Sequence, residues 1–397
     1  MKSQLRIFSI YISLHLLSSN VFSQIAFTNG ENALEISGVI SAYYNWRFLD
    51  ASNPNNHIGN NASNPLDQKK NTFALGTTRI NLQGMYTRKF EYRAQFDIAQ
   101  FGFASTTGEY PPVLDAYIVY KPTNTFRITA GYQKLPYSAN NLASYASQPY
   151  WQRAEITRGY IFSRRDVGVT LKQSFFNERI NLYAGVYSGM GEYILTSTTG
   201  GDNDPSGQPE YAARVDFSTV KYNYNDIYDS KKANHLILNV GFNGRYTKKT
   251  NSLPGLVDYD LKIVSGQRTL IGADAAFMYK GFSGQFEIHQ LIITPTGGDT
   301  TRLLGKSTNY FRAGGILAEL NYFNRKLKSG VYVRYDNFIP NDLIQNNMEQ
   351  TLSFGYNYFM RGFKSVLKIQ YFYRLDKNNP NLLRTSDQLR VGWQFTF

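Results

Sequence analysis

The chain has 397 residues and is rich in Tyr (31) and Phe (27), yet no apolar run after its N-terminus is long enough for a transmembrane helix, which excludes a helical membrane protein. It contains no Cys, which excludes a disulfide framework and thiol chemistry. The formal net charge is +13, but the basic residues are scattered along the chain and form no run longer than two, which argues against nucleic acid as a partner.

Residues 1–23 are expected to form a secretory signal peptide. Lys2 and Arg6 give a charged start, and residues 7–17 are mostly apolar. Val21 and Ser23, in the stretch Val21-Phe22-Ser23, are aliphatic and small at the expected cleavage positions. Gln24 would then begin the mature chain. The alternative is an uncleaved anchor helix, which is disfavoured because the apolar stretch is short and interrupted by polar residues.

The first strands show a pattern that the rest of the chain repeats. Residues 34–48 alternate apolar and polar side chains, which is the period of a β-strand with one apolar and one polar face. Residues 50–71 are rich in Asn, Pro and Ser and predict a long loop. Residues 72–87 predict a second strand, which turns tightly at residues 88–90 into a third.

Short turns and long loops then alternate along the chain. Further short turns are expected at residues 121–124, 176–178, 280–283, 324–328 and 360–363, with residues 222–232 as a longer member of the same set. Long connections are expected at residues 105–112, 136–164, 189–209, 248–268, 295–307, 340–347 and 376–385. Eight long loops and seven short turns predict about sixteen strands, an even number.

The last stretch, residues 386–397, predicts where this sheet lies. Its apolar face consists of Leu389, Val391, Trp393, Phe395 and the terminal Phe397. Aromatic residues belong at the interfaces of a bilayer, and the stretch resembles the terminal strand of bacterial outer-membrane barrels. A sheet in lipid must close, because an unpaired backbone group there costs several kcal/mol. The predicted fold is therefore an all-β transmembrane antiparallel β-barrel in the bacterial outer membrane. Both termini would face the periplasm, and the barrel would enclose an aqueous channel.

Three motifs between residues 126 and 192 resemble the phosphate-selective porin O and P family. Gly131, Lys134, Pro136 and Tyr137 match the end of a strand that leads into a long loop. An element of that loop, Tyr150-Trp151-Gln152-Arg153-Ala154, matches more loosely. The next strand opens on Arg165-Asp166-Val167-Gly168-Val169, which matches the family pattern outright.

The resemblance implies a sixteen-stranded porin that forms a homotrimer and folds its third long loop into the lumen. The family takes its name from members with a dense ladder of Arg and a cluster of Lys in the lumen, and no such ladder is clear in this sequence. The alternative for residues 136–164 is a surface loop that lies over the mouth of the barrel.

Channel selectivity comes from charged rings and from the narrowest point. Strand parity predicts that ten basic and nine acidic side chains face the lumen. Many of them are expected to form salt bridges across the wall, so the expected anion preference rests on the small excess of basic side chains. The basic set is Arg79, Arg93, Arg127, Lys172, Arg179, Arg214, Arg245, Arg334, Lys368 and Arg390; the acidic set is Glu35, Asp97, Asp115, Asp166, Asp216, Asp274, Glu287, Glu319 and Asp336.

The third loop is the expected constriction, with aromatic residues packed on the wall and guanidinium groups facing water, where they bind phosphate-like anions as forks. The candidate pore and anion-binding residues are Arg79, Arg93, Arg127, Arg153, Arg158, Arg165, Lys172 and Arg214. Arg165 and Asp166 could instead fix the end of the loop to the wall.

The expected function is passive diffusion of small hydrophilic solutes, with anions such as phosphate favoured. Outer-membrane lipid, lipopolysaccharide and small anionic solutes are the expected partners. No cofactor or metal motif is present: Glu287 and His289 share one strand face, and residues 201–207 lack the Glu of a calcium loop. Two alternatives are a barrel accessory of a secretion or nutrient-uptake complex and, less favoured, a barrel-type enzyme that uses His235 or His289.

Overall fold

The alternating segments form the strands of one large sheet. The computed structural model describes residues 25–48, 71–98, 112–157, 161, 163–191, 208–249, 264–375 and 386–397. The expected signal peptide, residues 1–23, lies outside these ranges. The strands are β1 (Ile25–Asn29), β2 (Asn32–Phe48), β3 (Asn71–Tyr86), β4 (Phe90–Asp97), β5 (Val113–Tyr120), β6 (Phe126–Lys134), β7 (Arg165–Phe175), β8 (Ile180–Tyr187), β9 (Glu210–Ser218), β10 (Ile237–Lys249), β11 (Gly266–Tyr279), β12 (Phe282–Pro295), β13 (Phe311–Asn324), β14 (Ser329–Phe338), β15 (Glu349–Phe363), β16 (Ser365–Arg374) and β17 (Asp387–Thr396).

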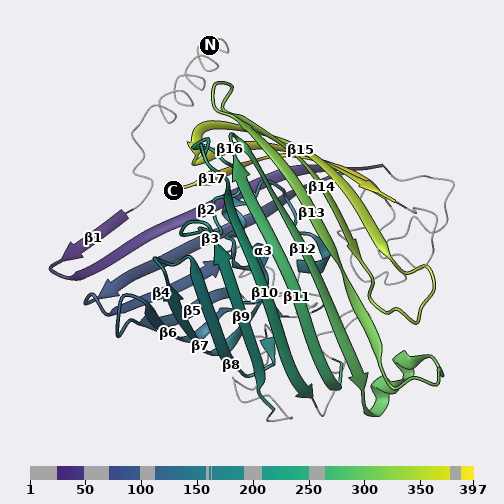
Figure 1. The fold of residues 1–397 in the computed structure, drawn as a ribbon. Helices are drawn as coiled ribbons and strands as arrows, with labels where there is room; N and C mark the ends of the chain where they lie inside the picture. The colour runs from purple at the N-terminus through teal and green to yellow at the C-terminus, as the bar shows by residue number, and fades with distance from the viewer. Residues whose placement is uncertain are drawn as a thin grey trace, which may run out of the picture.

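Strands β2 to β17 form a closed antiparallel barrel, which confirms the predicted sixteen strands (Figure 1). The ring closes where β17 pairs with β2, from Asp387 opposite Phe48 to Thr396 opposite Val39. Phe397 extends this closure, because its N–H and C=O both bond the backbone of Gly38. Closure leaves no unpaired edge for the lipid to solvate.

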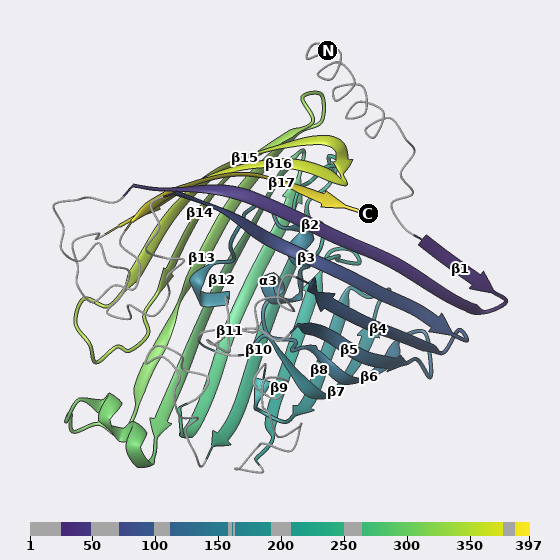
Figure 2. The ribbon, with the colours of Figure 1, turned by 180° about the vertical axis from the view of Figure 1, so that it is seen from behind.

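The short strand β1 was not expected from the sequence. It pairs with residues 32–36 of β2, directly beyond the stretch that β17 covers. In Figure 2 the β1–β2 hairpin projects from the end of the barrel at which the C-terminus lies. β1 therefore covers the part of β2 that extends past the terminal strand.

The two faces of the strands follow the predicted parity. On β15, the apolar side chains of Phe354 and Tyr356 are exposed on the outside, whereas Ser353 and Asn357 are buried on the inside. The same alternation runs around the barrel, so the outside is suited to lipid and the inside carries polar and charged groups. None of the helices in the described ranges is long and apolar enough to cross a bilayer.

The third long connection comprises residues 135–164 (loop 3), and its described residues, 135–157, 161, 163 and 164, lie inside the barrel. It contains α3 (Ala139–Leu142) and the short 3₁₀ turns η1 (Tyr145–Ser147) and η2 (Glu155–Thr157), and Figure 1 shows α3 within the ring of strands. Its apolar residues Leu135, Tyr137 and Ile156 pack on inward-facing residues of the wall, among them Leu291 and Phe311, in one buried cluster. The predicted inward folding of this loop is thus confirmed.

One connection differs from its prediction. Residues 222–232 were expected to form a periplasmic turn, and the segment does join β9 to β10 at the short-turn end. Its side chains, however, reach into the barrel: Tyr228 is 4% exposed and packs on Phe323 and Phe359. The connection between β9 and β10, residues 219–236, is therefore a second segment that folds into the lumen.

Candidate functional site

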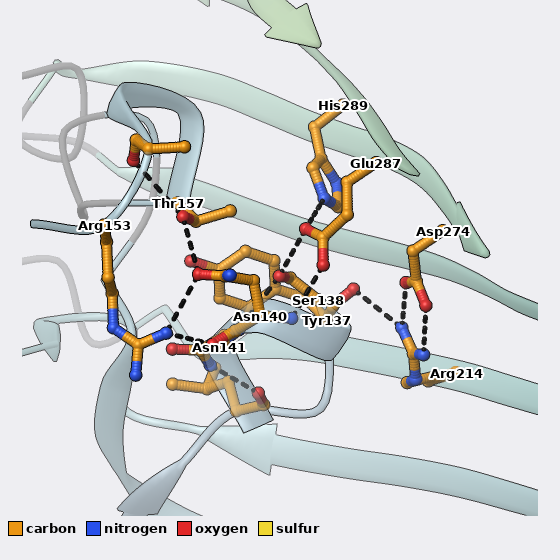
Figure 3. Close-up of polar contacts among 12 residues, drawn as sticks. Tyr137, Ser138, Asn140, Asn141, Arg153, Thr157, Arg214, Asp274, Glu287 and His289 are labelled. Carbon is orange, nitrogen blue, oxygen red and sulfur yellow. Dashed lines mark hydrogen bonds and ion pairs between the residues drawn. The ribbon is translucent and has the colours of Figure 1, made fainter. Parts of the chain in front are cut away.

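Loop 3 is fixed to the wall first at Glu287 of β12. The Ser138 hydroxyl and the Asn140 backbone N–H each donate to the Glu287 carboxylate at 2.6 Å, and His289 Nε2 lies 3.2 Å from it (Figure 3). Ser138 also accepts a hydrogen bond from the Asn141 N–H and so caps α3. The start of the loop is thus held by charge-assisted hydrogen bonds.

Arg153 links the second half of loop 3 to α3 in its first half. Its guanidinium donates to the side-chain oxygen of Asn140 at 2.9 Å and to the Ala143 carbonyl at 2.9 Å, and it also contacts the Asn140 carbonyl. Thr157 donates to the same Asn140 side chain at 3.0 Å (Figure 3). We expected Arg153 to face water, but it is 6% exposed. Burial lowers the pKa of Arg153 to about 9, which leaves the group protonated at neutral pH.

The middle of the loop is fixed to the far wall. The Trp151 N–H donates to Gln370 at 2.6 Å, and Lys368 Nζ donates to the Gln148 carbonyl at 2.7 Å. The Arg334 guanidinium carbon lies 4.3 Å from the ring centre of Tyr150. Loop 3 therefore leaves β6 and crosses to β14 and β16, so it narrows the lumen from the inside.

A water-accessible cavity of about 650 Å³ remains on the other side of the lumen. Its wall comes mainly from β2 to β8, with Ala26 of β1 at its edge, and Pro136 and Leu142 of loop 3 also line it. Four basic side chains line it, namely Arg93, Arg127, Lys134 and Lys172, together with the acidic Glu35, Glu91 and Asp115. This cavity is the candidate site for solute passage.

Two of these cations form a register pair. Arg127 of β6 lies directly opposite Lys172 of β7. Lys172 has Glu178 at 3.7 Å, whereas Arg127 makes no hydrogen bond or ion pair within the part of the chain that the structure describes. Like charges directly opposite one another are unfavourable unless an anion or water screens them. The pair therefore presents a positive site to the cavity.

The other two cations of the cavity are engaged by protein groups. Asp115 receives Arg93 at 3.5 Å and Arg165 at 2.8 Å. Lys134 donates to the Leu142 and Ala143 carbonyls at 2.9 and 2.8 Å and so supports the end of α3. The matched motif residues Lys134 and Arg165, which face each other in register, thus position loop 3 rather than extend into open water.

The remaining predicted site residues lie in the wall or outside the described ranges. Arg79 pairs with Asp97 at 3.2 Å, and Arg214 pairs with Asp216 and Asp274 at 2.7 and 2.6 Å. Both are the wall salt bridges that the sequence offered as the alternative. Arg158 lies outside the described residues. Of the seven candidates within the described ranges, Arg93, Arg127 and Lys172 are the ones that line the cavity.

Sequence reasoning had missed Lys134 as a cavity residue, although the Gly131-x-x-Lys134 motif offered a signal for it. Glu287 and His289 do share a face as expected, and both belong to the anchor of loop 3. In the described ranges no group of three or more His, Asp or Glu is arranged to hold a metal ion.

A closed sixteen-stranded barrel with an inward loop and a polar, water-accessible lumen defines an outer-membrane porin. The family described as "Phosphate-selective porin O and P" matches residues 53–397, so the chain belongs to that family. Its place is the bacterial outer membrane. None of the curated proteins matches the chain.

Solved structures support the fold at low sequence identity. OmpF of Salmonella typhi, in complex with daunomycin, is 11% identical with a TM-score of 0.60, over 94% of this chain and 100% of that one. The anion-selective porin from Comamonas acidovorans is 12% identical with a TM-score of 0.56, over 92% and 100%. The outer-membrane channel DcaP of Acinetobacter baumannii is 10% identical with a TM-score of 0.54, over 93% and 99%.

Proposed function

We propose that this porin lets small hydrophilic solutes diffuse passively and favours anions, phosphate among them. The observation that carries the proposal is the register pair of Arg127 and Lys172 on the cavity wall. A positive site in a narrow, low-dielectric passage raises the local concentration of anions. The N–H groups of the Arg127 guanidinium can donate two parallel hydrogen bonds to two oxygens of one phosphate, and the Lys172 ammonium adds a positive charge beside them.

The other candidate residues take supporting roles in this proposal. Arg93 adds positive charge at the cavity, where its side chain is 31% exposed beside Asp115. Arg79, Arg165 and Arg214 stabilise the wall through ion pairs. Arg153 maintains the conformation of loop 3. Arg158 stays a predicted anion contact of the same loop.

The test is the reversal potential of the purified porin in a planar bilayer under a salt gradient. Replacing Arg127→Gln and Lys172→Gln together should lower the anion-to-cation permeability ratio by about fivefold, the factor that matches the roughly 1 kcal/mol between unit charges about 4 Å apart in water. Lys326→Gln is the matched control, because it removes one charge from an exposed turn between β13 and β14. An unchanged ratio in the double variant would reject the register pair as the selectivity site.

The proposal includes a homotrimer. Strands β4, β5 and β6 are 8, 8 and 9 residues long, whereas β10 to β13 have 13 or 14. A strand that meets lipid needs about 9–11 residues, so a second copy is a better cover for this short wall than lipid is. Lipid and lipopolysaccharide would cover the longer wall. Chemical cross-linking in outer-membrane vesicles tests this, and a monomer alone would contradict it.

The accessory-barrel and enzyme alternatives make different predictions. A folded barrel that conducts no ions and co-purifies with one partner would favour the accessory function. An outer-membrane enzyme using a histidine would lose its activity when His235 and His289 are replaced. In the structure His289 is 2% exposed and lies 3.2 Å from Glu287, which weighs against that role.

A further inference from the structure

Residues 219–236, the connection between β9 and β10, fold into the lumen from the periplasmic end and meet loop 3 there. Asn225 accepts a hydrogen bond from the Ser144 N–H of loop 3 at 2.6 Å. Asn357 of β15 donates both to the Tyr228 hydroxyl at 2.9 Å and to the Pro149 carbonyl of loop 3 at 2.8 Å. The two inward segments are thus joined to each other and to the same wall residue.

The connection is firmly seated on the wall. Tyr228 packs with Phe323, Phe359 and Val366 in a buried aromatic cluster, its ring 5.6 Å from that of Phe359. Asp229 accepts the Gly281 N–H at 2.7 Å and the Ala233 N–H at 2.9 Å. These contacts belong to a fixed element of the barrel interior and not to a loosely held turn.

Little space remains between the two segments. The cavity bounded by Ala139 of loop 3, Tyr222 and Tyr224 of the connection and Gln285 of β12 has a volume of about 10 Å³. A single water molecule needs roughly 10–15 Å³ of such volume, so at most about one water fits between loop 3, the connection and β12 at this point. The other side of the lumen keeps the cavity of about 650 Å³ along β2 to β8.

The charged groups on the closed side are buried and engaged by protein groups. This side contains the five predicted lumenal acids Asp216, Asp274, Glu287, Glu319 and Asp336, each no more than 6% exposed, together with the buried bases Arg214, Arg334 and Lys368. Tyr224 of the connection donates to Asp216, and loop 3 donates to Glu287 and, through the Glu155 N–H at 3.2 Å, to Asp336. The open side carries the Arg127–Lys172 pair.

We propose that residues 219–236 are a second selectivity element, which together with loop 3 fills the side of the lumen along β9 to β16 and confines solutes to the side along β2 to β8, past the Arg127–Lys172 pair. The inference rests on the proposed anion preference and gives it a cause beyond the two basic side chains. The buried charges of the closed side are withdrawn from the solute path, and solutes on the open side must pass the Arg127–Lys172 pair.

The chain has no Cys, so single cysteines can map the solute path without further changes. Thr129→Cys places a thiol on the wall of the large cavity, and Gln285→Cys places one at the small closed cavity. A negatively charged methanethiosulfonate, added to the open porin in a bilayer, should lower the conductance of the Thr129 variant. It should react at least about tenfold more slowly with the Gln285 variant, since anions concentrate at the Arg127–Lys172 pair on the other side of the lumen. Equal reaction at both positions would overturn the proposal, whatever the ion selectivity of the channel.

A second variant tests the selectivity element directly. Replacing residues 222–230 by an Asn-Gly turn should make the Gln285→Cys thiol reactive, raise the conductance and lower the anion preference. If that variant does not fold, Tyr228→Ala releases the same segment by removing its aromatic anchor. Unchanged selectivity with a reactive Gln285→Cys thiol would reject the selectivity role. A wild-type channel without anion preference would instead reject the proposed function, while the thiol pattern would still report the path.

Discussion

Arg214 of β9 reaches across strand β10 to Asp274 of β11, and two hydrogen bonds of 2.6 and 2.7 Å join the pair. Between them lies Gly241, which is in register with Asp274 on one side and with Asp216 on the other. The side chains of Arg214 and Asp274 are 0% and 1% exposed. Arg214 also donates to the Tyr137 carbonyl of loop 3 at 3.0 Å, so one buried guanidinium joins the wall to the loop (Figure 3).

Asp274→Asn should destabilise the barrel strongly, because it removes a charge that compensates a fully buried guanidinium. A loss of about 3 kcal/mol in the free energy of unfolding is expected for such a buried pair. The temperature at which the folded band shifts to the unfolded band on a gel measures this. Glu31→Gln is the control, since its ion pair with Arg88 is exposed and should contribute nothing measurable. Equal shifts for both variants would contradict the argument.

Gly241→Ala should also destabilise the barrel, because the added methyl carbon would lie 2.2 Å from the Arg214 guanidinium and 2.8 Å from Asp216. Overpacking of this kind costs about 1–3 kcal/mol. On the same strand, Gly244→Ala meets no atom closer than 3.7 Å and should be tolerated. Chemical unfolding in detergent compares the two, and a tolerated Gly241→Ala would show that the ion pair does not need the space above this residue.

Glu287→Gln should loosen loop 3. The substitution keeps the shape of the side chain but removes the charge that accepts from Ser138 and Asn140, at a cost of about 2 kcal/mol. We expect noisier single-channel currents and faster tryptic cleavage within the loop. Glu91→Gln, on the cavity wall and paired with Lys121, is the control that leaves the loop anchor intact. Identical noise and cleavage in both variants would remove Glu287 as the anchor.

The barrel could be predicted from the sequence because successive side chains of a strand point to opposite faces, which leaves an alternation of apolar and polar residues in the sequence. Trp393 and Phe395 share a face and are 40% and 36% exposed on the outside, as the alternation of the last stretch required. The side of the barrel on which each loop lies followed from the same reading, since antiparallel strands alternate their ends.

The site could be predicted only in part, because register across a long loop is not visible in a sequence. β6 and β7 are separated by loop 3, so nothing in the residue order placed Arg127 opposite Lys172. Arg153 was expected to face water, but its guanidinium donates to the backbone carbonyls of residues 140 and 143. These carbonyls come together in the short helix α3, and the alternation of apolar and polar residues does not reveal such a helix inside a loop. Tyr222, Tyr224 and Tyr228 were a neglected signal: aromatic residues in a periplasmic turn need a surface to cover them.

The measurement that tests the central claim most directly is the reversal potential of the wild-type porin in a planar bilayer under a potassium chloride gradient, followed by addition of phosphate. The account predicts a steady conductance and a reversal potential that is shifted from zero toward the equilibrium potential of chloride. It also predicts that the chloride current falls as phosphate occupies the site at Arg127 and Lys172. A reversal potential shifted toward the equilibrium potential of potassium would contradict it, and so would the absence of conductance from a folded and heat-modifiable barrel.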